Sequence, residues 1–201
     1  MRHDLWFPSS ISSEYLTSID NRKIEDYCLM LKSKDPGRSI SNIGGWQSNN
    51  LDINVPELQE LFFEIRKQLN ILKTDIGMKD NVELDIDNIW ININEKNSYN
   101  DLHSHPGSPY SGVYYFKCNR EDSGNIMFKS PIVAHEYHLD DMLFKNNPQL
   151  VGHTRCFYQP DEQKILFFPG WLQHSVTPNN NEQSRISISF NTQVLVFGDR
   201  L

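Results

Sequence analysis

The chain has 201 residues, of which 38% are hydrophobic and 11% aromatic, and it carries a formal net charge of −7. This length fits one domain with a sizeable core. The net negative charge argues against a nucleic-acid partner. The sequence contains no run of about 20 apolar residues, so no membrane span is predicted. Three widely spaced cysteines, and no signal-peptide-like apolar segment in the first twenty residues, favour a cytoplasmic protein without a disulfide framework.

The first eighty residues predict helices that support a later core. Residues 1–13 are expected to form a short strand or arm. A helix is predicted from Asp20 to the Asp35-Pro36-Gly37 turn, because apolar residues recur there at helical spacing. Residues 44–48, Gly-Gly-Trp-Gln-Ser, predict a flexible loop. Pro56 then opens the clearest helix, at 56–73, which is expected to cover a sheet with its apolar face: Leu58, Leu61, Phe62, Ile65, Leu69 and Leu72.

After Lys79 the apolar residues alternate with period two, which is typical of strands. The phase changes between Ile86 and Ile89, and this predicts a β-bulge near Asp87-Asn88. Beyond it, amides share the face opposite the isoleucines. Further strands are predicted at 111–117, 124–128, 164–168, 172–178 and 185–197. Helices followed by many short strands favour a mainly β fold with flanking helices, a sandwich or barrel, in one domain whose residues 1–79 support a core at 80–201.

Three histidines form the candidate metal site. In an extended strand, alternate side chains share a face, so His103 and His105 should point the same way, as should Asp101. His174, at the end of an apolar strand just past a Pro-Gly turn, is the candidate third ligand. Such imidazoles suit iron, zinc, copper or nickel, although a histidine on a strand is more often a polar residue of the surface or core that binds no metal.

The remaining histidines are weaker candidates. The sequence His135-Glu136-Tyr137-His138 is one residue short of the H-E-x-x-H motif, so its two histidines would not stack one helical turn apart. We interpret it and His153 as loop or lid surface, and His3 as part of the terminal arm.

An anion clamp is predicted beside the histidines. Arg185, Ser187 and Ser189 alternate onto one face of a strand, and Tyr115 on a neighbouring strand offers a phenolic donor. A guanidinium that engages a carboxylate through two hydrogen bonds, with a hydroxyl beside it, is what a dicarboxylate ligand needs. The alternative is that Arg185 pairs with a surface acid and that the serines face solvent.

The second half of the chain resembles the double-stranded β-helix 2-oxoglutarate/Fe(II) oxygenases, the prolyl-hydroxylase-like branch in particular. The resemblance covers roughly residues 42–192, and more narrowly the sequence is similar to a small family of bacterial and phage oxygenases. It is carried by Gly44-Gly-Trp-Gln-Ser48, His103-Ser-His105-Pro106, Ser111-Gly-Val-Tyr-Tyr115, Gly124-Asn-Ile-Met-Phe128, Phe167-Phe-Pro-Gly-Trp-Leu-Gln-His174 and Arg185-Ile-Ser-Ile-Ser-Phe-Asn191. It implies a jelly-roll, cupin-like fold.

By position, the resemblance assigns His103 and His174 as metal ligands and Arg185 as the residue that binds the far carboxylate of 2-oxoglutarate. Tyr115 and either Ser187 or Ser189 would supply hydroxyl groups beside Arg185 in the cosubstrate pocket, and Asn92 would supply an amide. His105 stands where the wider superfamily has Asp or Glu. We favour His103, His105 and His174 as the ligands; Asp101 as the third ligand, or a site with only two histidines, are the alternatives.

The function implied is an Fe(II)- and 2-oxoglutarate-dependent dioxygenase that hydroxylates a C–H bond, with ascorbate as the reductant in vitro. Trp46, Trp90 and the 130–158 insertion are rim or lid candidates, with burial in the core as the alternative for the tryptophans. The expected partner is a small-molecule or peptidyl substrate, with no nucleic acid and no membrane. The sequence does not identify the substrate or the oligomeric state, and a homodimer is one of the states that it allows. The rival function is a non-catalytic cupin-like β-sandwich that binds a metal or ligand through the same histidines.

Overall fold

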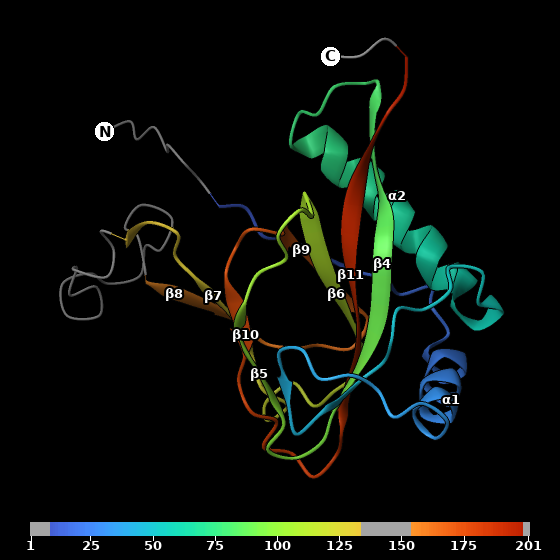
Figure 1. Cartoon of the computed structure of the whole chain (residues 1–201), viewed down its shortest axis with the longest axis vertical. Coiled ribbons are helices and arrows are strands. Elements are labelled where there is room, and N and C mark those ends of the chain that lie inside the picture. The colour runs from blue at the N-terminus through green and yellow to red at the C-terminus, as the bar shows by residue number, and fades with distance from the viewer. Residues whose placement is uncertain (1–8, 134–153, 199–201) are drawn as a thin grey trace.

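The computed structural model describes residues 9–133 and 154–198, and these form two facing antiparallel sheets (Figure 1). One sheet has the order β1-β9-β6-β11-β4-β3 and the other β2-β5-β10-β7-β8. The strands are β1 (Ser12–Tyr15), β2 (Asn42–Ile43), β3 (Trp46–Gln47), β4 (Val82–Asn94), β5 (Tyr99–His103), β6 (Tyr110–Lys117), β7 (Ile126–Lys129), β8 (Arg155–Tyr158), β9 (Lys164–Pro169), β10 (His174–Val176) and β11 (Arg185–Val196). The predicted mainly β fold, a double-stranded β-helix with flanking helices, is confirmed.

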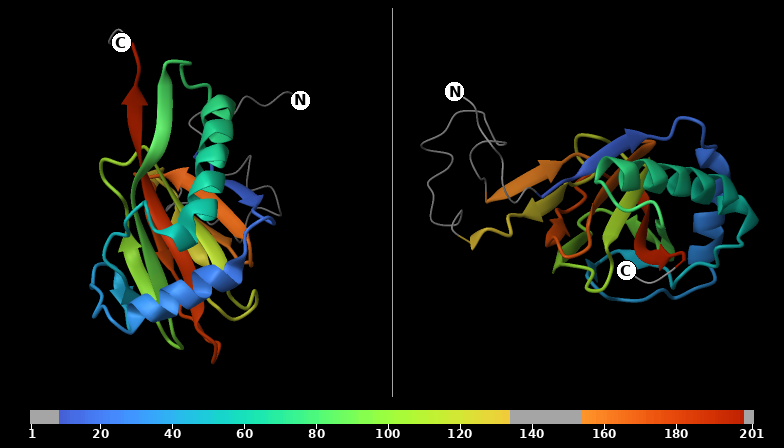
Figure 2. Two further views of the ribbon diagram at one scale, coloured as in Figure 1. Left: turned by 90° about the vertical axis from the view of Figure 1, so that its right-hand side faces the viewer. Right: turned by 90° about the horizontal axis from the view of Figure 1, so that it is seen from above.

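The six-stranded sheet is covered on its outer face by α2 (Gln59–Asp75), as predicted (Figure 2). A short 3-10 turn at Pro56–Leu58 leads into the helix. Its apolar stripe packs on the outward isoleucines of β4 and β11, and every fully buried aliphatic or aromatic side chain there contributes about 1.5–3 kcal/mol. The stripe is Leu61, Phe62, Ile65, Leu69 and Leu72, all within one buried cluster.

The first helix, α1 (Asn21–Lys32), also follows the sequence prediction. Asp20 caps it by accepting a hydrogen bond from the backbone N–H of Arg22. Ile24 and Cys28, one turn apart, are the residues it buries. No helix in the described ranges is long and apolar enough to cross a membrane.

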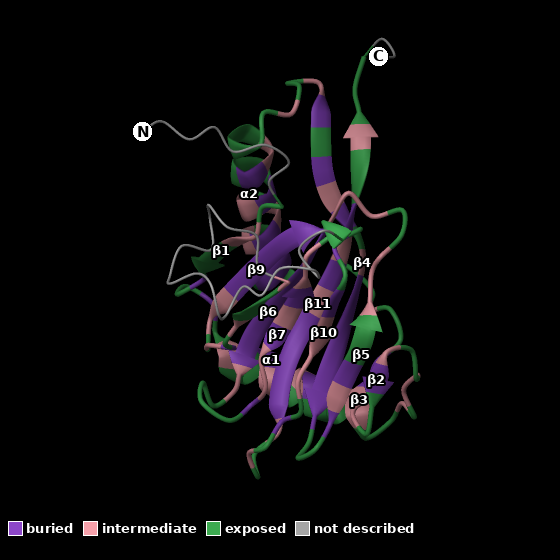
Figure 3. Cartoon of the chain, turned by 90° about the vertical axis from the view of Figure 1, so that its left-hand side faces the viewer, coloured by how far each residue is buried: buried purple, intermediate pink, exposed green. Residues whose placement is uncertain are grey.

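The predicted bulge is present in β4. Asn88 pairs with Asn191 and Ile86 with Thr192, so Asp87 is an extra residue opposite β11. After it, Ile89, Ile91 and Ile93 join the core beneath α2. The intervening residues Trp90, Asn92 and Asn94 therefore face the space between the two sheets, and Figure 3 shows β4, β6, β9 and β11 largely buried there.

The interior between the sheets is only partly apolar. A small cluster fills one side of it: Val113, Tyr115, Ile126, Phe128, Leu166, Phe168 and Leu172. Beyond this cluster, polar side chains line a cavity between the sheets.

Three sequence predictions needed correction. Residues 44–48 do not form a simple flexible loop, because β2 and β3 flank a turn there and pair with β5 and β4. β10 is shorter than the predicted 172–178, because a turn from Pro169 to Leu172 precedes it. The expected 130–158 insertion contains β8, which pairs with β7; its residues 134–153 lie outside the described residues.

Candidate metal centre and cosubstrate pocket

Three histidines meet between the sheets, and the ligand nitrogens of His103, His105 and His174 lie within 4.8 Å of one another. His174 in β10 pairs with His103 at the end of β5, and their ring centroids are 4.3 Å apart. His105 does not continue that strand, contrary to the alternation argument, because β5 ends at His103. The loop that follows returns His105 to the site: its backbone N–H donates to the carbonyl of Gly170 at 2.7 Å, and its ring centroid lies 5.1 Å from each of the other two.

Backbone carbonyls fix the tautomers of two of these rings. Nδ1 of His103 is 2.7 Å from the carbonyl oxygen of Asp101, and Nδ1 of His174 is 2.9 Å from that of Leu172. A carbonyl only accepts, so both Nδ1 atoms carry the proton, and each neutral ring presents the Nε2 lone pair. Burial lowers the pKa of His103, that of His105 to about 4 and that of His174 to about 3. At neutral pH all three imidazoles are therefore uncharged electron-pair donors.

The alternative ligand Asp101 lies elsewhere. Its side chain is exposed and does not line the cavity, although its backbone carbonyl orients His103. Within the described ranges, the cluster around His174 contains no carboxylate. His3, His135, His138 and His153 lie outside the described residues.

The histidines open onto a cavity of about 330 Å³ whose floor is β11. Arg185, Ser187 and Ser189 line it on one face of the strand, and the residues between them, Ile186 and Ile188, are buried in the core beneath α2. The alternation predicted from the sequence therefore directs the polar face inward.

Arg185 is the buried cation of this cavity, at 2% exposure. One of its terminal nitrogens donates to the carbonyl of Ser123 at 2.8 Å, while its Nε has no partner. No carboxylate in the described ranges forms an ion pair with it, and burial lowers its pKa. A buried guanidinium without a counter-ion is costly, so this position fits an anionic ligand.

Tyr115 and Asn92 complete the pocket wall. Tyr115 pairs with Ser187 across the ladder and is buried. Burial raises its pKa to about 12, and the nearby Arg185 only partly opposes the shift, so the phenol stays protonated and able to donate. The amide of Asn92 donates to the hydroxyl of Ser189 at 3.0 Å, which orients that hydroxyl.

The residues present fit Fe(II) with 2-oxoglutarate. Three neutral nitrogens on adjacent elements leave the other positions of an octahedral ion open for ligands. The same cavity holds the buried guanidinium of Arg185, which has no counter-ion and an unpartnered Nε, and which therefore suits a second carboxylate.

Sequence reasoning missed several cavity residues. Arg38, from the segment before β2, lines it, as do Gln47 and Asn50. Trp90, a rim candidate, lies 5.7 Å from the His105 ring, centroid to centroid, whereas Trp46 packs on the outer core and does not line the cavity. Helix-stop and loop patterns around these residues carry no signal for a site; only the tertiary arrangement reveals them.

Comparisons with known proteins identify the family and the fold. A family model described as "Putative 2OG-Fe(II) oxygenase" matches residues 88–191. A Pseudomonas putida prolyl-4-hydroxylase is similar with a TM-score of 0.61 and 12% identity over 92% of each chain. A collagen prolyl hydroxylase of Paramecium Bursaria Chlorella virus-1, in complex with 2OG, is similar with a TM-score of 0.58 and 12% identity over 90% of this chain and 94% of the viral one.

A third similar structure is HygX from Streptomyces hygroscopicus, with nickel and 2-oxoglutarate bound. Its TM-score is 0.60 and its identity 11%, over 92% of this chain and 82% of HygX. At such identities the likeness establishes the fold. No protein with a curated description matches the chain.

Proposed function

Because the chain belongs to the 2OG-Fe(II) oxygenase family, we propose that it is an Fe(II)- and 2-oxoglutarate-dependent dioxygenase that hydroxylates a C–H bond of a small-molecule or peptidyl substrate. The observation that carries the proposal is a juxtaposition in one cavity. Three neutral histidines converge there, and Arg185, buried and without a counter-ion, lines the same space.

His103, His105 and His174 would hold the metal. His103 and His174 would use Nε2, since their Nδ1 protons are held by backbone carbonyls. When bound, the metal supplies the redox chemistry that couples decarboxylation of 2-oxoglutarate to succinate with oxidation of a substrate C–H bond. With three neutral ligands the centre is one charge unit more positive than one with a carboxylate ligand.

Arg185 would bind the carboxylate of 2-oxoglutarate that lies far from the metal. Its unpartnered Nε–H points to a two-donor engagement, and the protonated Tyr115 and the hydroxyl of Ser187 would donate beside it. The apolar side chains of Val113, Phe168 and Val176 line the same cavity and would exclude water from the bound cosubstrate.

The test is succinate release from 2-oxoglutarate by the full chain with Fe(II) and ascorbate, first without any substrate. An oxygenase turns the cosubstrate over slowly under these conditions, and His174→Ala should abolish the release. If the wild type releases no succinate and 2-oxoglutarate does not bind to the metal-loaded protein, the proposal is wrong. The remaining function would then be metal binding by a β-sandwich.

A further inference from the structure

The guanidinium of Arg38 is a second cation that lines the cavity. No acidic side chain among the described residues lines it. The backbone N–H of Arg38 donates to the carbonyl of Gln47 at 2.8 Å, which ties the segment to β3. The preceding Gly37 has φ +74°, and a Cβ there would lie 2.5 Å from the Trp46 ring, so only glycine fits this turn. The backbone of Arg38 is therefore positioned by the turn at Gly37 and by its hydrogen bond to β3.

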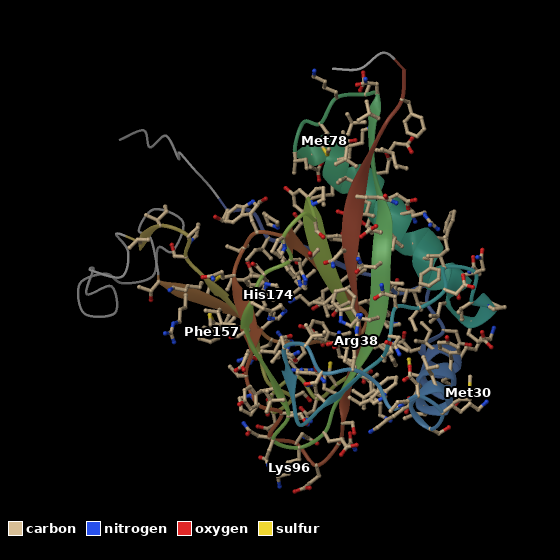
Figure 4. The ribbon with its side chains drawn as sticks, in the orientation of Figure 1. Met30, Arg38, Met78, Lys96, Phe157 and His174 are labelled. Carbon is tan, nitrogen blue, oxygen red and sulfur yellow. The ribbon has the colours of Figure 1, made fainter. Side chains whose placement is uncertain are left out.

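The side chain of Arg38 is held over Trp90. Its guanidinium carbon lies 5.9 Å from the centroid of that ring, and one terminal nitrogen donates to Asn50 at 3.0 Å. Its Nε is buried and has no hydrogen-bond partner. No acidic residue in the described ranges forms an ion pair with Arg38, which lines the same cavity as His174 (Figure 4).

Charge decides what this second cation can bind. Among the described residues that line the cavity, none is Asp or Glu, while two are arginines. The proposed cosubstrate has two carboxylates, one for the metal and one for Arg185, so it leaves Arg38 without an anion. Trp90 lies between Arg38 and His105, with its ring 5.7 Å from the imidazole, so a ligand held by Arg38 would lie along the indole toward the metal site.

We propose that Arg38 binds a carboxylate of the primary substrate, whose apolar part rests on Trp90 with the oxidised C–H bond directed at the three histidines. This inference rests on the proposed function. The substrate class is then a small carboxylic acid. A cavity of about 330 Å³, at the low end for small-molecule sites and shared with 2-oxoglutarate, favours a compact molecule. A planar carboxylate suits a guanidinium that makes one hydrogen bond, from a terminal nitrogen to Asn50, and whose Nε has no partner.

The experiment uses the full chain loaded with Mn(II), which does not turn over, and saturated with 2-oxoglutarate. Binding is measured by calorimetry for pairs that differ only in charge: hexanoate and hexanamide, 3-phenylpropionate and its amide, and N-acetyl-L-leucine and its amide. Phenyl phosphate is included as a second anion. We expect at least one acid to bind at least tenfold more tightly than its amide, and Arg38→Ala to remove that preference. Arg38→Lys should restore part of it.

Two further variants separate this inference from the proposed function. Arg38→Ala should leave 2-oxoglutarate affinity within about twofold of wild type, and Arg66→Ala, which removes a surface guanidinium paired with Asp85, should change neither binding step. The inference is overturned if no acid is preferred over its amide, if the preference survives Arg38→Ala, or if only the phosphate shows an Arg38-dependent gain. It is also overturned if Arg38→Ala weakens 2-oxoglutarate as much as Arg185→Ala, which would place Arg38 in the cosubstrate pocket. Failure of 2-oxoglutarate to bind wild type would instead refute the proposed function.

Discussion

Replacing Arg185 by alanine is expected to weaken 2-oxoglutarate binding while leaving metal binding almost unchanged. The side chain is 2% exposed, donates to one backbone carbonyl, that of Ser123, and has a free Nε. The three histidines come from β5, β10 and the loop after β5, whereas Arg185 begins β11. The substitution therefore removes the cation without removing a candidate metal ligand.

The expected size follows from the burial of the pair. Removing one partner of a buried, hydrogen-bonded charge pair costs about 2–5 kcal/mol, because the other charge is left without compensation. At about 1.4 kcal/mol per decade, the apparent dissociation constant for 2-oxoglutarate should rise by about one and a half to three and a half orders of magnitude. Arg185→Lys should recover only part of this loss, since an ammonium is a point charge without the planar fork.

The assay is a titration of 2-oxoglutarate into the Mn(II)-loaded protein by calorimetry, with Mn(II) affinity measured separately. Arg38→Ala is the matched control, because it removes the other guanidinium of the same cavity. Thermal unfolding of each unliganded variant checks the loss of the hydrogen bond to Ser123. Wild-type affinity in Arg185→Ala, or an equal loss of Mn(II) and 2-oxoglutarate binding, would refute the reasoning.

Three further predictions concern the histidines and their loop. His174→Ala should abolish stoichiometric Mn(II) binding in equilibrium dialysis, whereas His138→Ala should leave it intact; equal effects would contradict the assignment. Burial holds the pKa of His105 at about 4 and of His174 at about 3, below the ordinary 6.5 of an unfolded chain, so protonation favours unfolding. The metal-free protein should therefore lose on the order of 2–4 kcal/mol of unfolding free energy in urea titrations between pH 7 and pH 5, and a flat profile would disagree. Gly170→Ala places a Cβ 2.2 Å from the carbonyl oxygen of Ser108 and should weaken Mn(II) binding by displacing the loop of His105, while a wild-type affinity would show that this loop adjusts freely.

Local patterns were sufficient for much of the fold. The α2 stripe, the strand periodicity after Lys79 and the phase change at Asp87 all depend on neighbours in sequence, and each has its predicted place in the structure. The alternation of Arg185 and Ser187 likewise predicted a shared face, and the cavity lies on it. Regular elements express their spacing directly, so sequence reasoning was reliable there.

Features that depend on distant contacts were beyond such reasoning. The backbone of His105 is held by the carbonyl of Gly170, which lies in a loop between other strands. Strand alternation therefore placed His105 correctly beside His103, although the strand ends before His105. Arg38 follows a helix stop and has no local signature; its relation to Trp90 arises only when β3 pairs with β4. Irregular segments take their positions from the tertiary fold, which a single sequence specifies only indirectly.

The bulge in β4 has a consequence for chain length. Asn88 and Ile86 oppose consecutive residues of β11, so a chain without Asp87 would retain every other pair of this long ladder. Deletion of one residue elsewhere in the strand, for example at Asn92, would shift all the pairs on one side and exchange inward with outward side chains. Asp87 is therefore the position in β4 where evolution or design could shorten the chain by one residue without turning the amides of the cavity wall toward α2.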